Sequence, residues 1–182
     1  MAWITAEDLR GTAGAKQAFD QDKFEDAAEI ACQKVEELCG PIAWAAIAGE
    51  RVEVSGADEV CLRYRVTRGL TDVSAFYPAT PYLLTDWIAE GQVLKHRTRT
   101  PIYADLSVSY QTGYFDDTVT DAKAPAWARV MAKLIGQQYL RVAKRFNISA
   151  DDPVTGIGFL VPDAALDIGH DYLIVRGAIG NG

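Results

Sequence analysis

The chain has 182 residues, of which 49% are hydrophobic and 24% are charged, and its formal net charge is −7. This length is typical of a single domain, and the ordinary composition excludes a collagen, a coiled-coil rod and a wholly disordered chain. No apolar run approaches the ~18 residues of a membrane-spanning helix, and the first residues lack the basic and apolar regions of a secretory signal. The acidic balance argues against a protein that wraps DNA by bulk charge attraction.

Capping and apolar periodicity predict two helices in the first forty residues. Thr5, followed by two acidic residues, is typical of the N-cap of a short helix over about residues 5–10. Apolar residues at helical spacing then predict a long helix over about residues 22–39. Gly40 and Pro41 follow in the order that ends a helix.

A second long helix is predicted over about residues 125–146, near the end of the domain. Pro125 is expected at its first position, where the missing N–H costs nothing. Gly136 lies inside this helix, although glycine costs about 1 kcal/mol there relative to alanine. We therefore expect another helix to approach closely at Gly136.

Between these helices the apolar period changes from helical to strand-like, over about residues 42–114. Apolar and polar residues alternate there, as in strands with one buried face, and prolines and glycines mark the turns. We interpret the region as a small antiparallel β module inserted between the helices rather than as an independent domain. The candidate strands lie near residues 52–54, 60–66, 73–77, 93–98 and 106–111.

Residues 148–182 lose this periodicity and contain many glycines and prolines. They are predicted to form an extended C-terminal arm that contacts a partner by adding a strand. The arm residues expected to bind the partner are Ile157, Phe159, Leu160, Val161, Tyr172, Leu173, Ile174, Val175 and Arg176.

The predicted fold class is therefore α+β and mainly helical. It consists of a small bundle of two long helices plus a short N-terminal helix, with the inserted antiparallel β module. Residues 1–147 would form the domain, and residues 148–182 the extended arm.

The charges are segregated along the chain. Residues 20–39 hold seven acidic and two basic residues, a net charge of −5, whereas residues 125–147 hold five basic residues and no acid. Three interpretations remain open: the two helices neutralise each other within one chain, they meet between identical subunits, or the basic helix meets nucleic acid. The candidate inter-subunit residues are Glu25, Asp26, Glu29, Glu36 and Glu37 on one helix, and Arg129, Lys133, Arg141, Lys144 and Arg145 on the other.

Motifs for catalysis, for metal binding and for cofactor binding are weak. The sequence holds no Gly-x-Ser-x-Gly elbow, no Walker phosphate loop and no Gly-x-Gly-x-x-Gly run. No catalytic residue, metal ligand or cofactor is predicted, and a small intracellular hydrolase using His96 or His170 is a distant alternative. The cysteines Cys32, Cys39 and Cys61 are expected to act as small buried apolar residues.

Five segments in order carry a resemblance to a known family. They are Trp3–Leu9, Ala27–Ala31, Glu36–Pro41, Val108–Tyr114 with its Tyr-x-x-Gly-Tyr ending, and the proline-started Ala124–Arg129. In this order the chain resembles the head-to-tail adaptor (head completion or connector) proteins of long-tailed bacteriophages.

The resemblance implies a non-enzymatic structural protein of the virion neck, assembled in the host cytoplasm. Such adaptors form a ring, typically of twelve copies, between the capsid portal protein and the stopper, and the C-terminal arm engages the portal. Genomic DNA would pass through the ring without sequence-specific binding, since acidic residues repel its phosphates. A stopper or tail-completion protein of the same neck is the alternative, and no membrane is expected to take part.

Overall fold

The computed structural model describes residues 2–10, 21–76, 80–119, 122–146 and 161–174. These residues divide into two compact units. The helical unit lies within Met1–Cys39 and Lys123–Leu173, and the β unit consists of Gly40–Ala122 together with Ile174 among the described residues.

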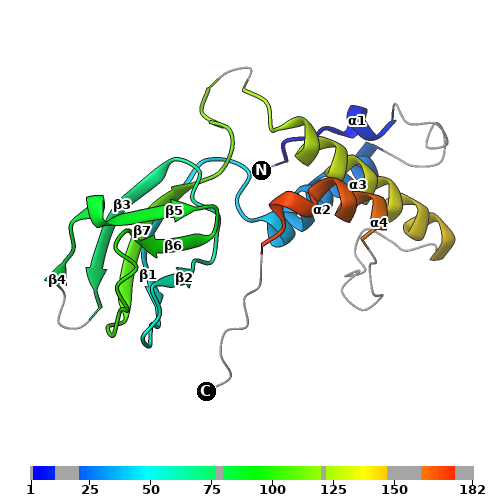
Figure 1. Cartoon of the computed structure of the whole chain (residues 1–182). Coiled ribbons are helices and arrows are strands. Elements are labelled where there is room, and N and C mark those ends of the chain that lie inside the picture. The colour runs from blue at the N-terminus through cyan, green and yellow to red at the C-terminus, as the bar shows by residue number, and fades with distance from the viewer. Residues whose placement is uncertain (1, 11–20, 77–79, 120–121, 147–160, 175–182) are drawn as a thin grey trace. The chain divides into compact units, whose positions relative to one another are not determined.

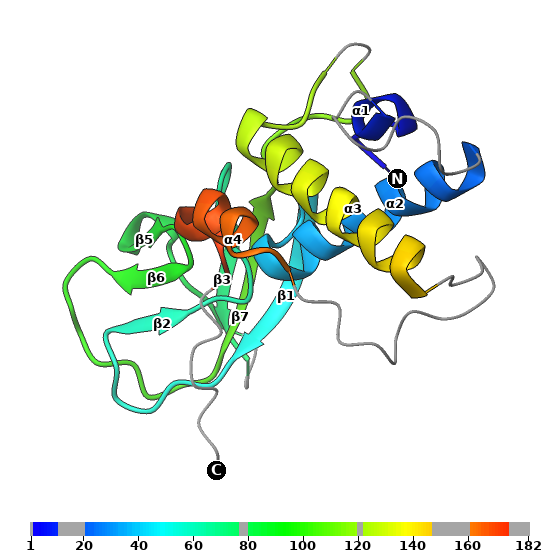
Figure 2. The same cartoon turned by 90° about the vertical axis from the view of Figure 1, so that its right-hand side faces the viewer.

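The helical unit is built on the pairing of two long helices, α2 (Gln21–Cys39) and α3 (Ala126–Phe146). They lie side by side in both views (Figures 1 and 2), and α1 (Ala6–Arg10) and α4 (Asp163–Gly169) pack against them. Small side chains on α2 let the helices approach closely. The buried residues of α1 to α3 include Leu9, Phe24, Ala27, Ala31, Val35, Ala128, Met131 and Ile135.

The predicted helix limits agree with the structure to within about one residue. Thr5 caps α1, as predicted: its hydroxyl accepts a hydrogen bond from the Asp8 N–H at 3.3 Å. Pro125 was predicted at the first position of the long helix, but it immediately precedes α3. Its carbonyl accepts the first hydrogen bond of the helix, from the Arg129 N–H. The close approach at Gly136 is confirmed, since a Cβ there would lie 2.9 Å from a methyl group of Leu9.

The β unit consists of two antiparallel sheets. The four-stranded sheet has the order β1 (Ala45–Val52), β7 (Leu106–Thr112), β3 (Gly69–Ala75) and β4 (Thr80–Pro81). The three-stranded sheet has the order β2 (Glu59–Cys61), β6 (Val93–His96) and β5 (Trp87–Glu90), and a short 3₁₀ helix, η1 (Leu84–Asp86), precedes β5. Both sheets contribute to one core, formed by Val52, Val54, Leu62, Val73, Trp87, Leu94, Leu106, Val108 and Tyr110.

Strand β7 is the centre of the four-stranded sheet, with β1 on one side and β3 on the other. Its residues alternate strictly between buried and half-buried positions, as expected of a strand that packs on one face only. Leu106, Val108 and Tyr110 point to the core and are fully buried. The other face carries the small polar residues Ser107 and Ser109.

The first and last segments of the β unit are hydrogen-bonded to each other. The Tyr114 N–H donates to the Ile42 carbonyl at 2.8 Å, and the Trp44 N–H donates to the Phe115 carbonyl at 2.9 Å. Gly113 allows this approach: its φ is 94°, and a Cβ on it would lie 2.2 Å from the Ala43 carbonyl oxygen. The Tyr-x-x-Gly-Tyr segment thus joins the two ends of the unit.

The predicted fold class, a mainly helical bundle of two long helices with a small β insertion, is wrong. The chain is α+β, with four helices and seven strands among the described residues, and the strands form a compact unit with a core of its own. The prediction failed because each strand is short and carries only a weak local signal. The sequence does not show that segments about sixty residues apart, such as β1 and β7, pair in one sheet.

The extended C-terminal arm is also corrected. Asp163–Gly169 forms helix α4 and His170–Tyr172 a turn of 3₁₀ helix, although the glycines and prolines there favoured an irregular segment. Ala165 is fully buried, and a Cβ on Gly169 would lie 2.7 Å from the Met131 sulfur. Close packing on α3 therefore stabilises a helix that is too short to form alone.

The cysteine prediction holds for two of the three residues. Cys32 and Cys39 are buried on α2, as expected, whereas Cys61 is exposed on β2. The prediction failed at Cys61 because β2 is a short edge strand, whose outward positions face solvent.

Replacing Gly113 with alanine should destabilise the β unit by at least about 3 kcal/mol, because the new Cβ meets backbone atoms and the positive φ adds strain. Urea unfolding followed by tryptophan fluorescence measures the loss. Gly69→Ala is the matched control: its φ is 116°, but no atom lies within 4 Å of the added Cβ. The control should lose only about 1–2 kcal/mol from backbone strain, and equal losses at both positions would contradict the close-contact argument.

Candidate functional site

The acidic face of α2 is the strongest candidate for an interaction surface. Glu25, Glu29 and Glu37 are exposed, and Asp26 and Glu36 are half-buried. Two of these carboxylates have local partners: Gln21 donates to Glu25 at 2.6 Å, and Lys34 pairs with Glu37 at 2.6 Å.

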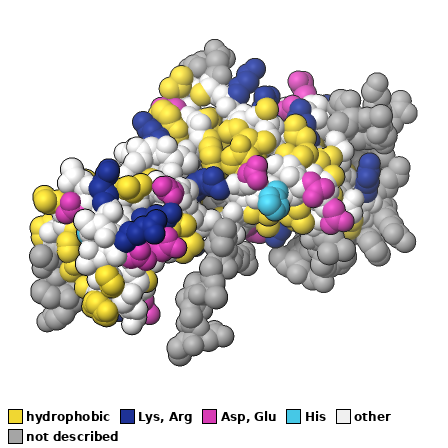
Figure 3. Space-filling view, viewed as in Figure 1, with side chains coloured by type: hydrophobic (Ala, Val, Ile, Leu, Met, Phe, Trp, Pro, Cys, Tyr) yellow, Lys and Arg dark blue, Asp and Glu magenta, His cyan; other side chains and the backbone are white. Residues whose placement is uncertain are grey.

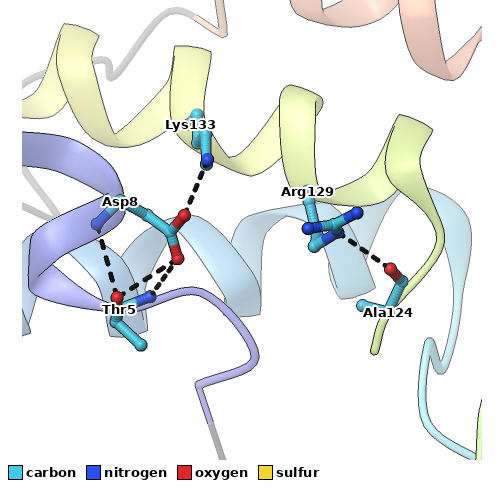
Figure 4. A network of polar contacts seen from close by, with 5 residues as sticks. All are labelled: Thr5, Asp8, Ala124, Arg129 and Lys133. Atoms are coloured by element: carbon cyan, nitrogen blue, oxygen red, sulfur yellow. Dashed lines mark hydrogen bonds and ion pairs between the residues drawn. The ribbon is translucent and has the colours of Figure 1, made fainter. Parts of the chain in front are cut away.

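Two basic residues of α3, Arg129 and Lys133, have partners outside α2. The Arg129 Nε donates to the carbonyl of Ala124, two residues before the start of α3, at 3.0 Å. Lys133 forms an ion pair with Asp8 of α1, with the nitrogen 2.7 Å from the carboxylate oxygen (Figure 4).

The remaining three basic positions extend toward the end of α3. Arg141 is exposed. Lys144 and Arg145 belong to the helix, but their side chains lie outside the described part of the structure.

Within the described side chains, no ion pair joins α2 to α3, although the two helices pack along each other. The residues buried on the two helices are mainly apolar, whereas Glu25 and Glu29 are exposed. Among the described side chains, exposed Glu25 and Glu29 form no ion pair with α3, so they are available to a partner of opposite charge.

Asp8 connects the N-terminal helix to α3 through a small polar network. Its carboxylate accepts hydrogen bonds from the Thr5 N–H at 2.9 Å and from the Thr5 hydroxyl at 3.2 Å, in addition to the ion pair with Lys133 (Figure 4). Lys133 is the largest cause that holds the pKa of Asp8 below its usual value; partial burial opposes this, and the Thr5 N–H adds to it. This carboxylate has a structural role, because all of its contacts lie inside the helical unit.

A second polar network lies in the β unit, around Tyr110. The Tyr110 hydroxyl donates to Glu50 at 2.5 Å and accepts a bond from the Tyr64 N–H at 3.1 Å. Glu50 also accepts the Arg63 N–H at 2.7 Å. Burial, followed by the bond to Glu50, raises the pKa of Tyr110 far above its usual value, so the phenol stays protonated and fixes the loop after β2 to the sheet.

Sequence reasoning missed this network because of an irregularity in β1. The register of β1 against β7 shifts between Ile47 and Glu50, which turns Glu50 toward the inner face where Tyr110 lies. A bulge of this kind breaks the alternation on which the sequence prediction depends, and Gly49, with φ at 62°, is its one visible signal.

Aromatic rings of the β unit are covered by arginines. Arg68 lies 3.5 Å from the centre of the Trp44 ring, and Arg51 lies 4.6 Å from the centre of the Phe76 ring. Arg51 is also paired with Asp105 at 2.8 Å. These guanidinium groups are engaged within the unit, so the rings do not form an open basic platform of the kind that stacks nucleic-acid bases.

The predicted partner-binding residues of the C-terminal segment fall into two groups. Tyr172 stacks on Trp127 of α3, with ring centres 4.0 Å apart and planes within 4° of parallel, and the Leu173 N–H donates to the Gly169 carbonyl at 3.0 Å. Val161 and Ile174 are half-buried. Ile157, Phe159, Leu160, Val175 and Arg176 lie outside the described residues.

The surface around α4 mixes apolar and acidic side chains. Figure 3 shows hydrophobic atoms gathered on this face of the helical unit, with a histidine and several acidic groups beside them. His170 is exposed at the end of α4, with its Nδ1 3.4 Å from the Asp171 carboxylate. The other histidine, His96, lies in the β unit against the edge of Trp87.

The described residues hold no group of three or more histidine, cysteine or acidic side chains placed to bind a metal ion. None of the described helices has the length and apolar character to span a membrane. In comparisons with known proteins, no family model and no curated protein matches this chain.

Replacing Asp8 with asparagine should lower the free energy of unfolding by about 0.5–1 kcal/mol at neutral pH, because asparagine keeps an acceptor for Thr5 but loses the ion pair with Lys133. The pKa of Asp8 is lowered by folding, so its contribution is present above the unfolded pKa of about 3.9 and is lost as pH falls through the folded value. Urea titrations between neutral pH and about pH 3 should show the two proteins converging. Glu7→Gln is the control, and a pH-independent difference at Asp8 would contradict the ion-pair argument.

Proposed function

We propose that this chain is a structural subunit of a bacteriophage neck, which forms a ring between the capsid portal and the stopper and extends the DNA channel. The proposal joins the family resemblance of the sequence to one observation, the acidic face of α2. Glu25, Glu29 and Glu37 are exposed there, and none of them pairs with a described side chain of α3.

Charge on two different elements favours contacts of the head-to-tail type. The acids lie on α2, and exposed Arg141 lies on α3, so one copy can present its acidic face to the basic helix of the next. Contacts between two different surfaces of identical subunits generate closed rings when the rotation between neighbours closes. Complementary charges would also fix the orientation of the neighbours.

The same distribution suits a conduit for DNA. The sequence carries 25 acidic and 18 basic residues, so a ring of these chains has a large negative charge. Acidic groups repel the phosphates of DNA, which can then move through the ring without being held. The role is assembly, and it needs no covalent chemistry.

Electron microscopy of the full-length protein mixed with its portal protein tests the proposal most directly. We expect a closed ring on the symmetry axis of the portal, with the copy number that the portal symmetry allows. The ring should form on the portal even where the free protein is monomeric. A protein that stays unbound at high concentration would contradict the proposal.

Reversing the charge of Glu25 and Glu29 should weaken ring assembly on the portal by at least about ten-fold, because the two side chains lie four residues apart on one exposed helix face. The matched control is Glu53→Lys with Asp117→Lys, which changes the net charge equally on exposed positions of the β unit. Circular dichroism should show that both variants fold. Partial recovery of assembly by Arg141→Glu in the Glu25→Lys, Glu29→Lys background would support the α2–α3 contact, and equal losses in both double variants would overturn it.

A further inference from the structure

A cavity of about 430 Å³ lies in the β unit, between strand β5 and the beginning of β3. Six of its nine lining residues have apolar side chains, polar atoms form the larger part of the exposed wall, and Arg97 places one guanidinium group at the cavity. The residues that matter here are Val66, Leu70, Leu84, Ile88, Ala89 and Arg97, and we call this region the β5 cleft.

The β5 cleft lies along an open strand edge. β5 is the outer strand of its sheet, and a two-residue turn joins it to β6, with Gly91 at φ 64° and Glu90 opposite Val93. In such a hairpin the residues that flank the turn exchange both backbone bonds, and bonding then alternates along the strand. Ala89 therefore directs its N–H and C=O away from β6, and no described backbone group outside the hairpin bonds to them.

The bonds at the two ends of this edge agree with that alternation. The Trp87 N–H also points outward, where it donates to the Leu84 carbonyl. Past the other end of β5, the Gly91 carbonyl accepts the Val66 N–H at 2.8 Å. The outer edge is thus covered at both ends and open at Ala89, beside the cavity.

Large apolar side chains border the same region. Leu83 is 71% exposed, and Leu84, which lines the cavity, is 40% exposed; Tyr82 precedes them and is also exposed. Isolated exposed apolar residues are ordinary, but three in succession beside a cavity mark a contact surface.

Arg97, which lines the cavity, makes the surface favour a ligand with a negative charge. Its backbone N–H bonds to the Asp86 carbonyl, but its guanidinium has no ion pair among the described residues. Lys95, on the same strand region, is already paired with Glu90 at 2.8 Å and with Glu59 at 3.9 Å. The free charge at the cleft is therefore a single arginine, which suits one carboxylate and is too little for a nucleic acid.

We infer that the β5 cleft binds an extended peptide segment of a protein partner, which adds a short strand to β5 at Ala89. Its backbone would bond the open N–H and C=O of Ala89, an apolar side chain would enter the cavity, and a neighbouring carboxylate would pair with Arg97. This inference does not rest on the proposed neck function, because it depends only on the edge, the cavity and the charge of the β unit.

The test uses the full-length, ¹⁵N-labelled protein and a capped hexapeptide that alternates valine with glutamate. We expect a saturable change in the amide resonance of Ala89, and at least about ten-fold weaker binding of a peptide that carries lysine in place of glutamate. Arg97→Ala should weaken binding of the acidic peptide by about ten-fold, whereas Arg99→Ala, an exposed arginine two residues away, should not.

Ala89→Pro isolates the backbone contribution. Proline removes the outward N–H without breaking a bond to β6, and strand edges tolerate it there. We expect peptide binding to be lost while the spectrum remains that of a folded protein; if this variant does not fold, Arg97→Ala decides. Absence of any change at Ala89 with millimolar peptide, or unchanged affinity in Arg97→Ala, would overturn the inference. A change at Ala89 on concentrating the protein alone would overturn it as well, because a second copy would then occupy the cleft.

Discussion

The β unit depends on one constraint, the position of β7 between β1 and β3. Its inner face places Leu106, Val108 and Tyr110 in the core, and its two edges bond to strands that come from distant parts of the sequence. Pairing over such separations requires closing long loops before the contacts form, so the sheet cannot be assembled from local preferences alone. The Tyr110 hydroxyl extends this dependence to the loop after β2, because it holds both Glu50 and the Tyr64 backbone.

The helical unit is stabilised differently, by apolar packing between α2 and α3, while charged residues such as Glu25, Glu29 and Arg141 are exposed. α2 and α3 contact each other through alanines and a few larger residues, and no ion pair joins their described side chains. Solvent-exposed charges contribute little to the stability of one chain. Their segregation is therefore more informative about how the chain meets other molecules than about how it folds.

The sequence allowed prediction of the features that depend on local signals. The limits of α2, the cap at Thr5 and the close approach at Gly136 follow from residues within a few positions of each other. Helix α4 was missed because seven residues carry too little periodicity, and only packing on α3 stabilises them. The two-sheet core and the β5 cleft were missed because they depend on the pairing of distant strands, and the bulge at Glu50 reverses the local alternation. The acidic face of α2 was visible in the sequence, but the absence of an ion pair between it and the described side chains of α3 was not.

The hydrogen bonds between Ile42 and Tyr114 and between Trp44 and Phe115 have a consequence for how such a chain can evolve. They bring the start and the end of the β unit together, so the polypeptide that leaves α2 returns beside its point of departure before it continues toward α3. A segment whose two ends lie close together can be inserted, removed or exchanged with little change in the structure of the domain that carries it, as in domain insertion and circular permutation. The β unit therefore has the geometry of a transferable module, and the helical unit could keep its helix pairing while different modules are placed at the same junction.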